Sequence, residues 1–167
     1  MKTLFLLRHA KSQRKDEALP DFERPLNRRG QRAAETAGRY LKTNAREPDL
    51  ILSSPAVRTR ETVELVVKAA KWTTELRYDQ RIYAADGMRL AEVVAQIEND
   101  RKVVLIVGHN PAIEELLLLL TGTSEQVSAA SVAKIRIKAT KWANAVDKRS
   151  TLEWLLTAKE LQSASER

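Results

Sequence analysis

The sequence contains no cysteine and only two histidines among its 167 residues. Without cysteine the chain can form no disulfide, no thiolate metal site and no cysteine nucleophile. Two histidines are also too few for a typical protein zinc site, and no aspartate lies at a matching spacing. Sulfur chemistry and an ordinary zinc site are therefore excluded.

Long apolar runs are also missing. The run at 116–120 is far shorter than the stretch that a membrane span requires. The apolar stretch near the N-terminus is interrupted by Arg8, His9 and Lys11, and no small-residue cleavage site follows it, which argues against an export signal. We therefore expect a cytoplasmic protein without a membrane partner.

Aromatic residues make up only 5% of the chain, and they do not alternate with basic residues in the way that stacks bases. The net charge of +7 and the pI near 9.8 would suit nucleic acid, an acidic protein or a phosphorylated small molecule. A solvated basic surface accounts for most of this charge, because acidic residues interleave the basic stretches. Without the aromatic pattern, we expect no nucleic-acid partner.

Short apolar runs alternate with amphipathic segments along the first part of the chain. The runs predict buried strands at 3–7, 50–52 and 103–107, and the amphipathic segments predict helices at 28–43, 57–70, 90–97 and 112–120, the last ending at Gly122. This alternation predicts an α/β fold of three αβα layers with a mostly parallel sheet.

The C-terminal part has a different pattern. Residues 132–138 alternate apolar and basic side chains, and 150–156 form a second strand-like run, so we expect a hairpin that gives the sheet an antiparallel edge. Residues 159–167 have little to bury and are expected to fray. The prediction is one domain over residues 1–158, followed by this tail.

Each histidine stands at the end of a predicted strand. His9 follows Arg8 after the first run, and His109 follows Gly108 after the third. Ligands of open α/β sheets collect beyond the carboxyl ends of the strands, so the two imidazoles are expected to face one another across a site. The alternative is that both histidines make only structural hydrogen bonds at loop mouths.

Two helices are expected to begin at the same edge of the sheet. Ser54 precedes Pro55 and Asn110 precedes Pro111, an arrangement typical of an N-cap residue followed by proline at the first helical position. The free backbone N–H groups and the positive dipole end of a helix favour an anion, most often phosphate.

Arg8 and Arg58 add full positive charges at this edge. A guanidinium presents donors in a fork that matches two phosphoryl oxygens, and catalysis of phosphoryl transfer depends largely on such positioning and charge stabilisation. Imidazole can supply the nucleophile, and nearby cations keep it neutral. The sequence therefore predicts metal-independent phosphoryl transfer, with exposed surface arginines as the alternative interpretation.

Three segments in order resemble the histidine phosphatase superfamily, also called phosphoglycerate mutase-like: Arg8-His9, residues 54–62, and residues 108–111. The short chain, the form of residues 8–12 and the segment 24–30 are most similar to its small SixA-type branch of protein phosphohistidine phosphatases. The resemblance covers residues 2 to 120. One departure is Ala10, where the larger family usually has glycine, although this branch commonly carries alanine there.

The resemblance implies that His9 is the nucleophile, that Arg8 and Arg58 bind the phosphoryl group, and that His109 donates a hydrogen bond to it. It also implies a phosphoglycerate mutase-like mixed sheet with helices on both faces, no metal and no organic cofactor. Larger members carry a general acid between the second and third segments. Asp86 is the best candidate for that acid here, on position alone.

Four further residues are candidate phosphate or substrate ligands. Lys11 and Ser12 follow the nucleophile closely enough to contact phosphate, and Arg24 and Arg28 flank a Pro-Leu turn where they could line the rim of the site. For Arg28, the alternative is a solvated side chain at a helix start.

The expected activity is that of a phosphatase that forms a covalent phosphohistidine. A phosphohistidine protein is the favoured substrate, because an imidazole leaving group needs no strong general acid. The alternatives are a small-molecule phosphomonoesterase and, less favoured, a mutase or a non-catalytic phosphate-binding module.

Overall fold

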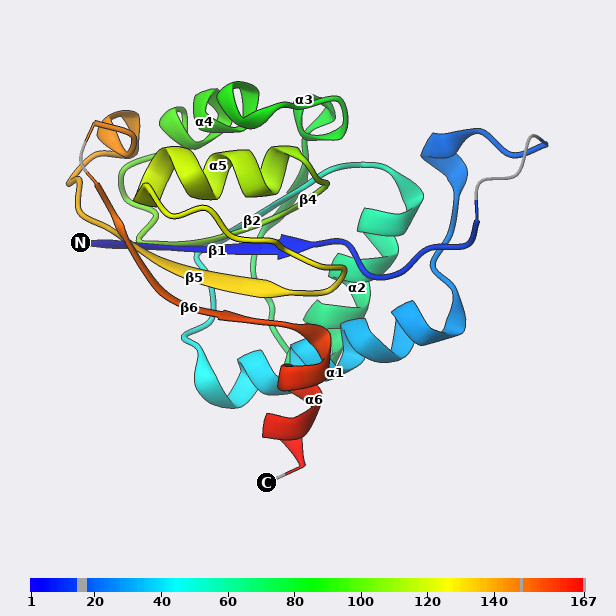
Figure 1. The fold of residues 1–167 in the computed structure, drawn as a ribbon. Helices are drawn as coiled ribbons and strands as arrows, with labels where there is room; N and C mark the ends of the chain where they lie inside the picture. The colour runs from blue at the N-terminus through cyan, green and yellow to red at the C-terminus, as the bar shows by residue number, and fades with distance from the viewer. Residues whose placement is uncertain (15–17, 148, 167) are drawn as a thin grey trace.

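Strand β1 lies inside a mixed sheet, flanked by β4 and β5 (Figure 1). The computed structural model describes residues 1–14, 18–147 and 149–166. In this part of the chain the sheet has the strand order β3-β2-β4-β1-β5-β6. Its strands are β1 (Lys2–Arg8), β2 (Leu50–Ser53), β3 (Leu76–Tyr78), β4 (Val103–Gly108), β5 (Val132–Ile137) and β6 (Thr151–Leu156). β3, β2, β4 and β1 are parallel, and β5 pairs antiparallel with both β1 and β6, which confirms the predicted antiparallel edge.

Helices cover both faces of the sheet. They are α1 (Arg28–Asn44), α2 (Val57–Ala70), α3 (Gln80–Tyr83), α4 (Gly87–Ala95), α5 (Ala112–Thr121) and α6 (Ala158–Ser165), with short 3-10 turns at η1 (Asp21–Glu23) and η2 (Trp142–Asn144). Figure 1 shows α3, α4 and α5 above the sheet and α1, α2 and α6 below it. No helix among the described residues is long and apolar enough to cross a membrane.

The side chains of β1 contribute to two hydrophobic cores, one on each face of the sheet. Leu4 and Leu6 belong to the cluster that includes α4 and α5, whereas Phe5 and Leu7 belong to the cluster that includes α1 and α2. Successive residues of a strand point to opposite faces, so a continuous apolar run can fill both cores. The predicted three-layer αβα fold is confirmed.

The carboxyl ends of three parallel strands lie in register. Arg8 of β1 pairs with Gly108 of β4, and Ser53 of β2 pairs with Val107 of β4. The residues that follow these strands are therefore delivered to one edge of the sheet. This is the structural basis of the site described below.

The C-terminal segment differs from the expectation of a frayed tail. Residues 158–165 form α6, whose N-cap Thr157 accepts a hydrogen bond from Glu160 N at 3.2 Å. Leu161 is fully buried in the hydrophobic core that α1 and α2 form with the sheet. A single apolar side chain at the right position is enough to dock this short helix, so the prediction for 159–167 was wrong over the described residues; Arg167 lies outside them.

Two short elements have no counterpart in the sequence patterns. β3 is a partly exposed edge strand of three residues and α3 is a single turn, and neither produces an apolar run or a helical period.

The predicted helix at 90–97 begins earlier, at Gly87, because Asp86 caps it. Gly122 ends α5 as expected, in the left-handed conformation with φ of 74°.

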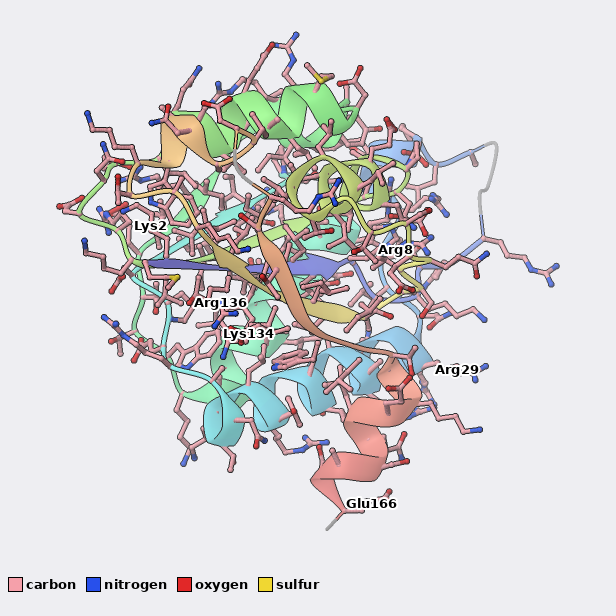
Figure 2. The ribbon with its side chains drawn as sticks, turned by 60° about the vertical axis from the view of Figure 1, so that its left-hand side comes forward. Lys2, Arg8, Arg29, Lys134, Arg136 and Glu166 are labelled. Carbon is pink, nitrogen blue, oxygen red and sulfur yellow. The ribbon has the colours of Figure 1, made fainter. Side chains whose placement is uncertain are left out.

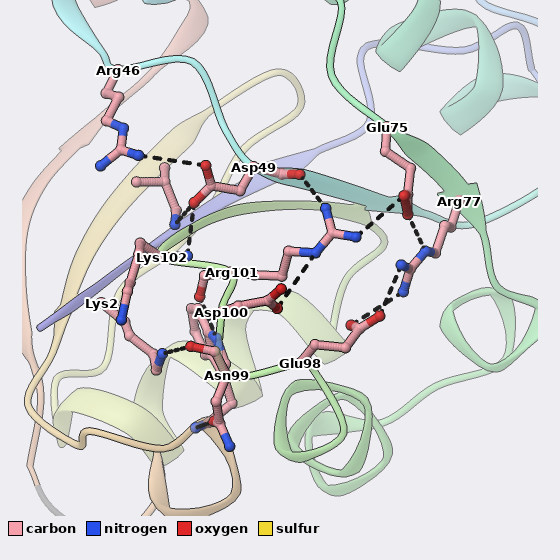
Figure 3. A network of polar contacts seen from close by, with 12 residues as sticks. Lys2, Arg46, Asp49, Glu75, Arg77, Glu98, Asn99, Asp100, Arg101 and Lys102 are labelled. Carbon is pink, nitrogen blue, oxygen red and sulfur yellow. Dashed lines mark hydrogen bonds and ion pairs between the residues drawn. The ribbon is translucent and has the colours of Figure 1, made fainter.

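The opposite end of the parallel strands carries a network of paired charges (Figure 3). Arg101 contacts Glu75 at 3.2 Å, Arg77 contacts Glu75 and reaches Glu98 at 2.8 Å, and Asp49 accepts hydrogen bonds from two backbone N–H groups at the start of β4. At this end of the molecule the arginines are paired with carboxylates.

Candidate active site

The two histidines meet at the carboxyl edge of the sheet. His9 follows β1 and His109 follows β4, and the centroids of their rings are 5.2 Å apart. The rings are tilted by 57° to each other, and the edge of Tyr83 packs on His109 with ring centroids 5.7 Å apart. The structure thus brings the two imidazoles together at one site, as the strand positions predicted.

A cavity of about 500 Å³ opens at this edge. It is lined by Arg8, His9, Lys11, Ser12, Arg24, Arg58, His109, Asn110 and Ala129. The lining contains several cationic side chains and no carboxyl group in the part of the chain that the structure describes. Such a cavity is suited to a small anion.

His9 is oriented by its own backbone. Its Nδ1 lies 2.7 Å from the carbonyl oxygen of Ala10. Because a carbonyl oxygen can only accept, we assign the ring hydrogen to Nδ1, which leaves the lone pair on Nε2. The backbone N–H of Ala10 in turn donates to Thr62 Oγ1 at 3.0 Å, and Thr62 donates to the carbonyl of Arg58, so this segment is tied to α2.

The backbone conformation at position 10 explains why alanine can replace glycine there. Among the described residues, only Lys71, Ala130 and Gly122 have a positive φ. The backbone at position 10 is therefore one that alanine adopts without strain, and its methyl group is fully buried in the core beneath the site.

Burial and positive charge keep both rings neutral. Burial, joined by the charges of Arg58 and Arg8, lowers the pKa of His9 to about 4, against the opposing hydrogen bond to Ala10. Burial, joined by His9 and Arg58, lowers the pKa of His109 to about 3. At neutral pH the free protein therefore has an unprotonated Nε2 on His9, which is the form that can attack an electrophile.

His109 is positioned by a serine from the neighbouring strand end. Its Nε2 lies 2.8 Å from Ser54 Oγ, and that oxygen also accepts a hydrogen bond from Ala56 N at 3.2 Å. We assign the serine hydrogen to the bond with Nε2, so the proton of the neutral imidazole is on Nδ1. His109 then offers Nδ1–H as a donor in the cavity.

Two arginines present unused donors in the same place. Nη1 of Arg8 donates to the carbonyl of Val127 at 3.0 Å, while Nε of Arg8 and Nε of Arg58 are buried without a hydrogen-bond partner. The described residues leave four such buried side-chain atoms, and the other two are Nδ1 of His109 and Oδ1 of Asn110. All four belong to residues that line this cavity. Oδ1 of Asn110 is an acceptor, but the other three atoms are donors. Buried donors are normally paired, so these three residues indicate a site for an anionic acceptor.

Asp21 fixes the orientation of Arg58. Nη1 of Arg58 donates to the backbone carbonyl of Asp21 at 2.8 Å, and Nη2 donates to its Oδ2 at 3.1 Å. The same carboxylate accepts from Tyr83 at 2.9 Å and from Arg24 Nε at 3.1 Å. Asp21 therefore holds both terminal nitrogens of the Arg58 guanidinium, and Nε of Arg58 is buried without a hydrogen-bond partner.

The comparisons with known proteins agree with this geometry. Residues 4–86 match the family model of the histidine phosphatase superfamily (branch 1). An uncharacterized protein of Mycobacterium leprae is 34% identical over 127 residues, which cover 74% of this chain and 76% of that protein. The chain belongs to the histidine phosphatase superfamily. It is therefore a phosphatase, a hydrolase of phosphoryl groups.

Two solved structures are similar to this histidine phosphatase over nearly their whole length. A protein of Nakamurella multipartitia assigned as a phosphohistidine phosphatase SixA is 26% identical, with a TM-score of 0.82 over 93% of this chain and 95% of that one. A protein of Agrobacterium tumefaciens with the same assignment is also 26% identical, with a TM-score of 0.81 over 93% of this chain and 97% of that one. The SixA-type resemblance is confirmed.

Most of the further candidate ligands also reach the cavity of this histidine phosphatase. Lys11, Ser12 and Arg24 line it, and Arg24 Nη1 contacts Ser12 Oγ at 3.2 Å. Arg28 does not: it is the exposed first residue of α1 and lies outside the cavity lining. Its position fits the alternative of a solvated side chain at a helix start.

Asp86 is not placed to act as the general acid. It is the exposed N-cap of α4, where its carboxylate accepts a hydrogen bond from Arg89 N at 2.9 Å, and it lies outside the cavity lining. The side chain closes a helix end instead of facing the histidines. Asp86 and Gly87 mark the start of α4. Sequence position alone could not distinguish an N-cap aspartate from a catalytic one.

The helix starts also differ from expectation. The N-cap residues are Ala56 for α2 and Pro111 for α5, each one or two residues beyond the predicted Ser54 and Asn110. Neither Ser54 nor Asn110 caps a helix, because Ser54 contacts His109 and Asn110 donates through Nδ2 to Val127 O at 2.8 Å. These side chains hold the site together.

Asp21 and Tyr83 are site residues that the sequence patterns missed. Both lie in short irregular or single-turn segments, η1 and α3, whose position over the site depends on tertiary packing. The only local signal was the position of Asp21 three residues before Arg24, which it contacts.

Proposed function

We propose that this histidine phosphatase hydrolyses phosphohistidine in a protein, with His9 as the nucleophile. The observation that carries the proposal is the lack of a usable general acid among the described residues around the cavity. Asp21 is a carboxyl group that bonds to two of the arginines there, Arg58 and Arg24. Partial burial raises its pKa, but the hydrogen bond from Tyr83 and the charges of Arg58 and Arg24 outweigh this and lower the pKa below its ordinary value.

An ionised Asp21 has no proton to give to an alkoxide leaving group. An alcohol leaving from a phosphomonoester needs a proton in the transition state, and its rate suffers without a donor. An imidazole leaving group differs, because the proton can already be present on its second nitrogen. The site is therefore better matched to cleavage of a P–N bond than of a P–O bond.

The reaction runs in two displacements at phosphorus. In the first, the Nε2 lone pair of His9 forms a bond to phosphorus while the bond from phosphorus to the substrate imidazole breaks, and the electron pair leaves with that protonated ring. In the second, water attacks phosphorus, the bond to His9 breaks with its electron pair returning to Nε2, and both protons of the water leave on the released dihydrogen phosphate. The guanidinium groups of Arg8 and Arg58 and the imidazole of His109, which line the cavity, stabilise the charge on the phosphoryl oxygens in both steps.

The solved structures support this substrate class. The proteins of Nakamurella multipartitia and Agrobacterium tumefaciens carry the assignment of phosphohistidine phosphatase, and each is similar to this chain over more than nine-tenths of its length. A small-molecule phosphomonoesterase would use the same four residues, so the choice between the two depends on the leaving group.

The test compares kcat/KM on a phosphohistidine protein, a phosphohistidine peptide and a panel of phosphomonoesters. We expect the phosphohistidine substrates to be preferred by about a hundredfold, the lower range of what a positioned general acid contributes. A phosphomonoester that performs better than the phosphoprotein would overturn the proposal. Rapid quenching should trap an acid-labile, alkali-stable phosphoryl group on the wild type and none on His9→Ala; labelling of His9→Ala would remove His9 as the nucleophile.

A further inference from the structure

A second hollow, of about 760 Å³, lies between α1 and α6. We call it the α1–α6 groove. Its charged lining residues are Arg29, Arg32, Glu35, Arg39 and Lys159, and its neutral ones are Ala33, Thr36, Ala158 and Gln162. Four cations face a single carboxylate. The groove is therefore strongly basic.

The cations of the groove have no acidic partners. Arg29, Arg32, Arg39 and Lys159 are exposed, and none of them forms an ion pair in the part of the chain that the structure describes. Over the described ranges, these four side chains make one hydrogen bond, from Arg39 to the hydroxyl of Thr36 at 3.1 Å. This differs from the far end of the sheet, where the arginines are paired with carboxylates (Figure 3). Among the described lining residues, only Glu35 offsets the positive charge of the groove.

Helix α1 carries this charge where it opposes helix stability. The first turn of α1 contains Arg28 and Arg29 and no acidic residue. The N-terminus of a helix is the positive end of its dipole, so cations there are unfavourable and acidic side chains are the usual choice. Local rules of this kind are broken mainly at functional positions. The arginines at the start of α1 are thus better explained by a ligand than by the fold.

The start of α1 is attached to the active-site loop. Asn27 N donates to the carbonyl of Lys11 at 3.0 Å, and a Cβ added to Gly30 would lie 2.0 Å from that same oxygen, so the helix touches the loop that follows His9. Figure 2 shows Arg29 and Arg8 toward the same end of the molecule, and Lys2 at the opposite end. Over ten residues, from Arg29 to Arg39, α1 extends the positive surface by about 15 Å away from the cavity.

We propose that the α1–α6 groove binds acidic side chains of the protein whose phosphohistidine enters the cavity. The inference rests on the proposed function and adds a partner surface to it. Complementary charge at the rim of an interface mainly increases the association rate and aligns the partner, so the groove would act on capture of the phosphoprotein and leave the chemical step unchanged. The partner it fits is an acidic protein face beside the phosphorylated histidine.

The test uses two phosphohistidine peptides of equal length, one with glutamate-rich flanks and one with glutamine at the same positions. The variant is Arg29→Glu/Arg32→Glu, two groove residues outside the cavity lining. The matched control is Lys138→Glu/Lys141→Glu, two exposed lysines beyond Ile137, which pairs with Lys2 at the far end of β1. Both variants change the net charge equally.

We expect wild type to prefer the glutamate peptide over the glutamine peptide by about tenfold in kcat/KM, the lower range for electrostatic steering, with the preference falling as salt rises. The groove variant should lose this preference and keep its activity on the glutamine peptide, whereas the lysine control should behave as wild type. Arg29→Gln/Arg32→Gln should give an intermediate preference, which covers the case in which charge reversal impairs folding.

The outcomes separate the groove from the proposed function. Two results would overturn the proposed role of the α1–α6 groove and leave phosphohistidine hydrolysis standing. One is equal kcat/KM of wild type on both peptides, and the other is a loss of preference in the lysine control as large as that in the groove variant. Failure of wild type to hydrolyse either peptide would instead contradict the proposed function. Single-stranded DNA is a polyanion without carboxylates. If it binds more tightly than the glutamate peptide, the groove would be assigned to nucleic acid and the partner proposed here would be overturned.

Discussion

Asp21 binds both terminal nitrogens of Arg58, one through its backbone carbonyl at 2.8 Å and the other through its carboxylate at 3.1 Å. Arg58 is 6% exposed, so its guanidinium has little water to replace these bonds. We therefore treat Asp21 as a positioning residue that holds the Arg58 guanidinium at the cavity.

Asp21→Ala should release Arg58 and raise KM while lowering kcat/KM by about a hundredfold, because small displacements of a phosphate-binding group are costly. Asp21→Asn keeps an acceptor oxygen and should recover part of the loss. Steady-state kinetics on a phosphohistidine peptide would show this. Unchanged kcat/KM in Asp21→Ala would mean that Arg58 holds its position without the carboxylate.

Asp86 provides a contrasting prediction, because it is a carboxylate with a structural contact and no place in the cavity. Asp86→Ala removes the N-cap of α4 and should lower the free energy of unfolding by about 1 kcal/mol. Its kcat/KM should equal that of wild type on both phosphohistidine and phosphomonoester substrates. A loss of activity confined to phosphomonoesters would restore Asp86 as a general acid.

The positions of the histidines were predictable because strand ends in a parallel sheet share an edge, and a run such as 103–107 marks its own end with Gly108. The roles of Asp21 and Tyr83 were not, because η1 and α3 are too short to leave a periodic pattern and are placed by packing over the site. The same reason applies to Asp86: the sequence showed an acid in a loop, and only the backbone geometry of α4 shows that the loop ends in a helix cap.

The depressed pKa values make a pH prediction. Because the pKa of His9 is lowered from 6.5 to about 4, the free enzyme keeps a neutral nucleophile well below pH 6. The pH profile of kcat/KM should therefore show no loss of activity near pH 6.5 from this group, and a loss only as pH approaches about 4. Ring ¹⁵N chemical shifts of the free protein would show the same; protonation of either histidine near pH 6.5 would contradict the burial argument.

The same shifts link stability to pH. The folded state favours neutral rings, so between about pH 6.5 and pH 4 the unfolded chain binds more protons at His9 and His109 than the folded chain does. The contribution of these groups to the free energy of unfolding is thus present above pH 6.5 and is lost as pH falls through that window. Urea unfolding of His9→Gln against wild type would measure the slope, which should be smaller in the variant.

Treatment with a chelator tests the expectation that catalysis needs no metal ion. The described residues contain no group of three or more His, Asp or Glu side chains placed to hold a metal ion. Activity on a phosphohistidine peptide should be the same before and after prolonged treatment with a chelator. Inactivation that added metal reverses would contradict the mechanism based on His9, Arg8 and Arg58.

The docking of α6 can be tested through its one buried side chain. Leu161 is fully buried beneath α1, so Leu161→Ala removes apolar contacts and leaves a cavity, at a cost of about 3 kcal/mol in the free energy of unfolding. Gln162→Ala, at the exposed neighbouring position, should change stability by less than about 0.5 kcal/mol. If α6 docks through Leu161, limited proteolysis should cleave Leu161→Ala near residue 157 sooner than Gln162→Ala. Equal stability and equal cleavage of the two variants would instead indicate that the C-terminal residues fray, as the sequence alone suggested, and would also remove one wall of the α1–α6 groove.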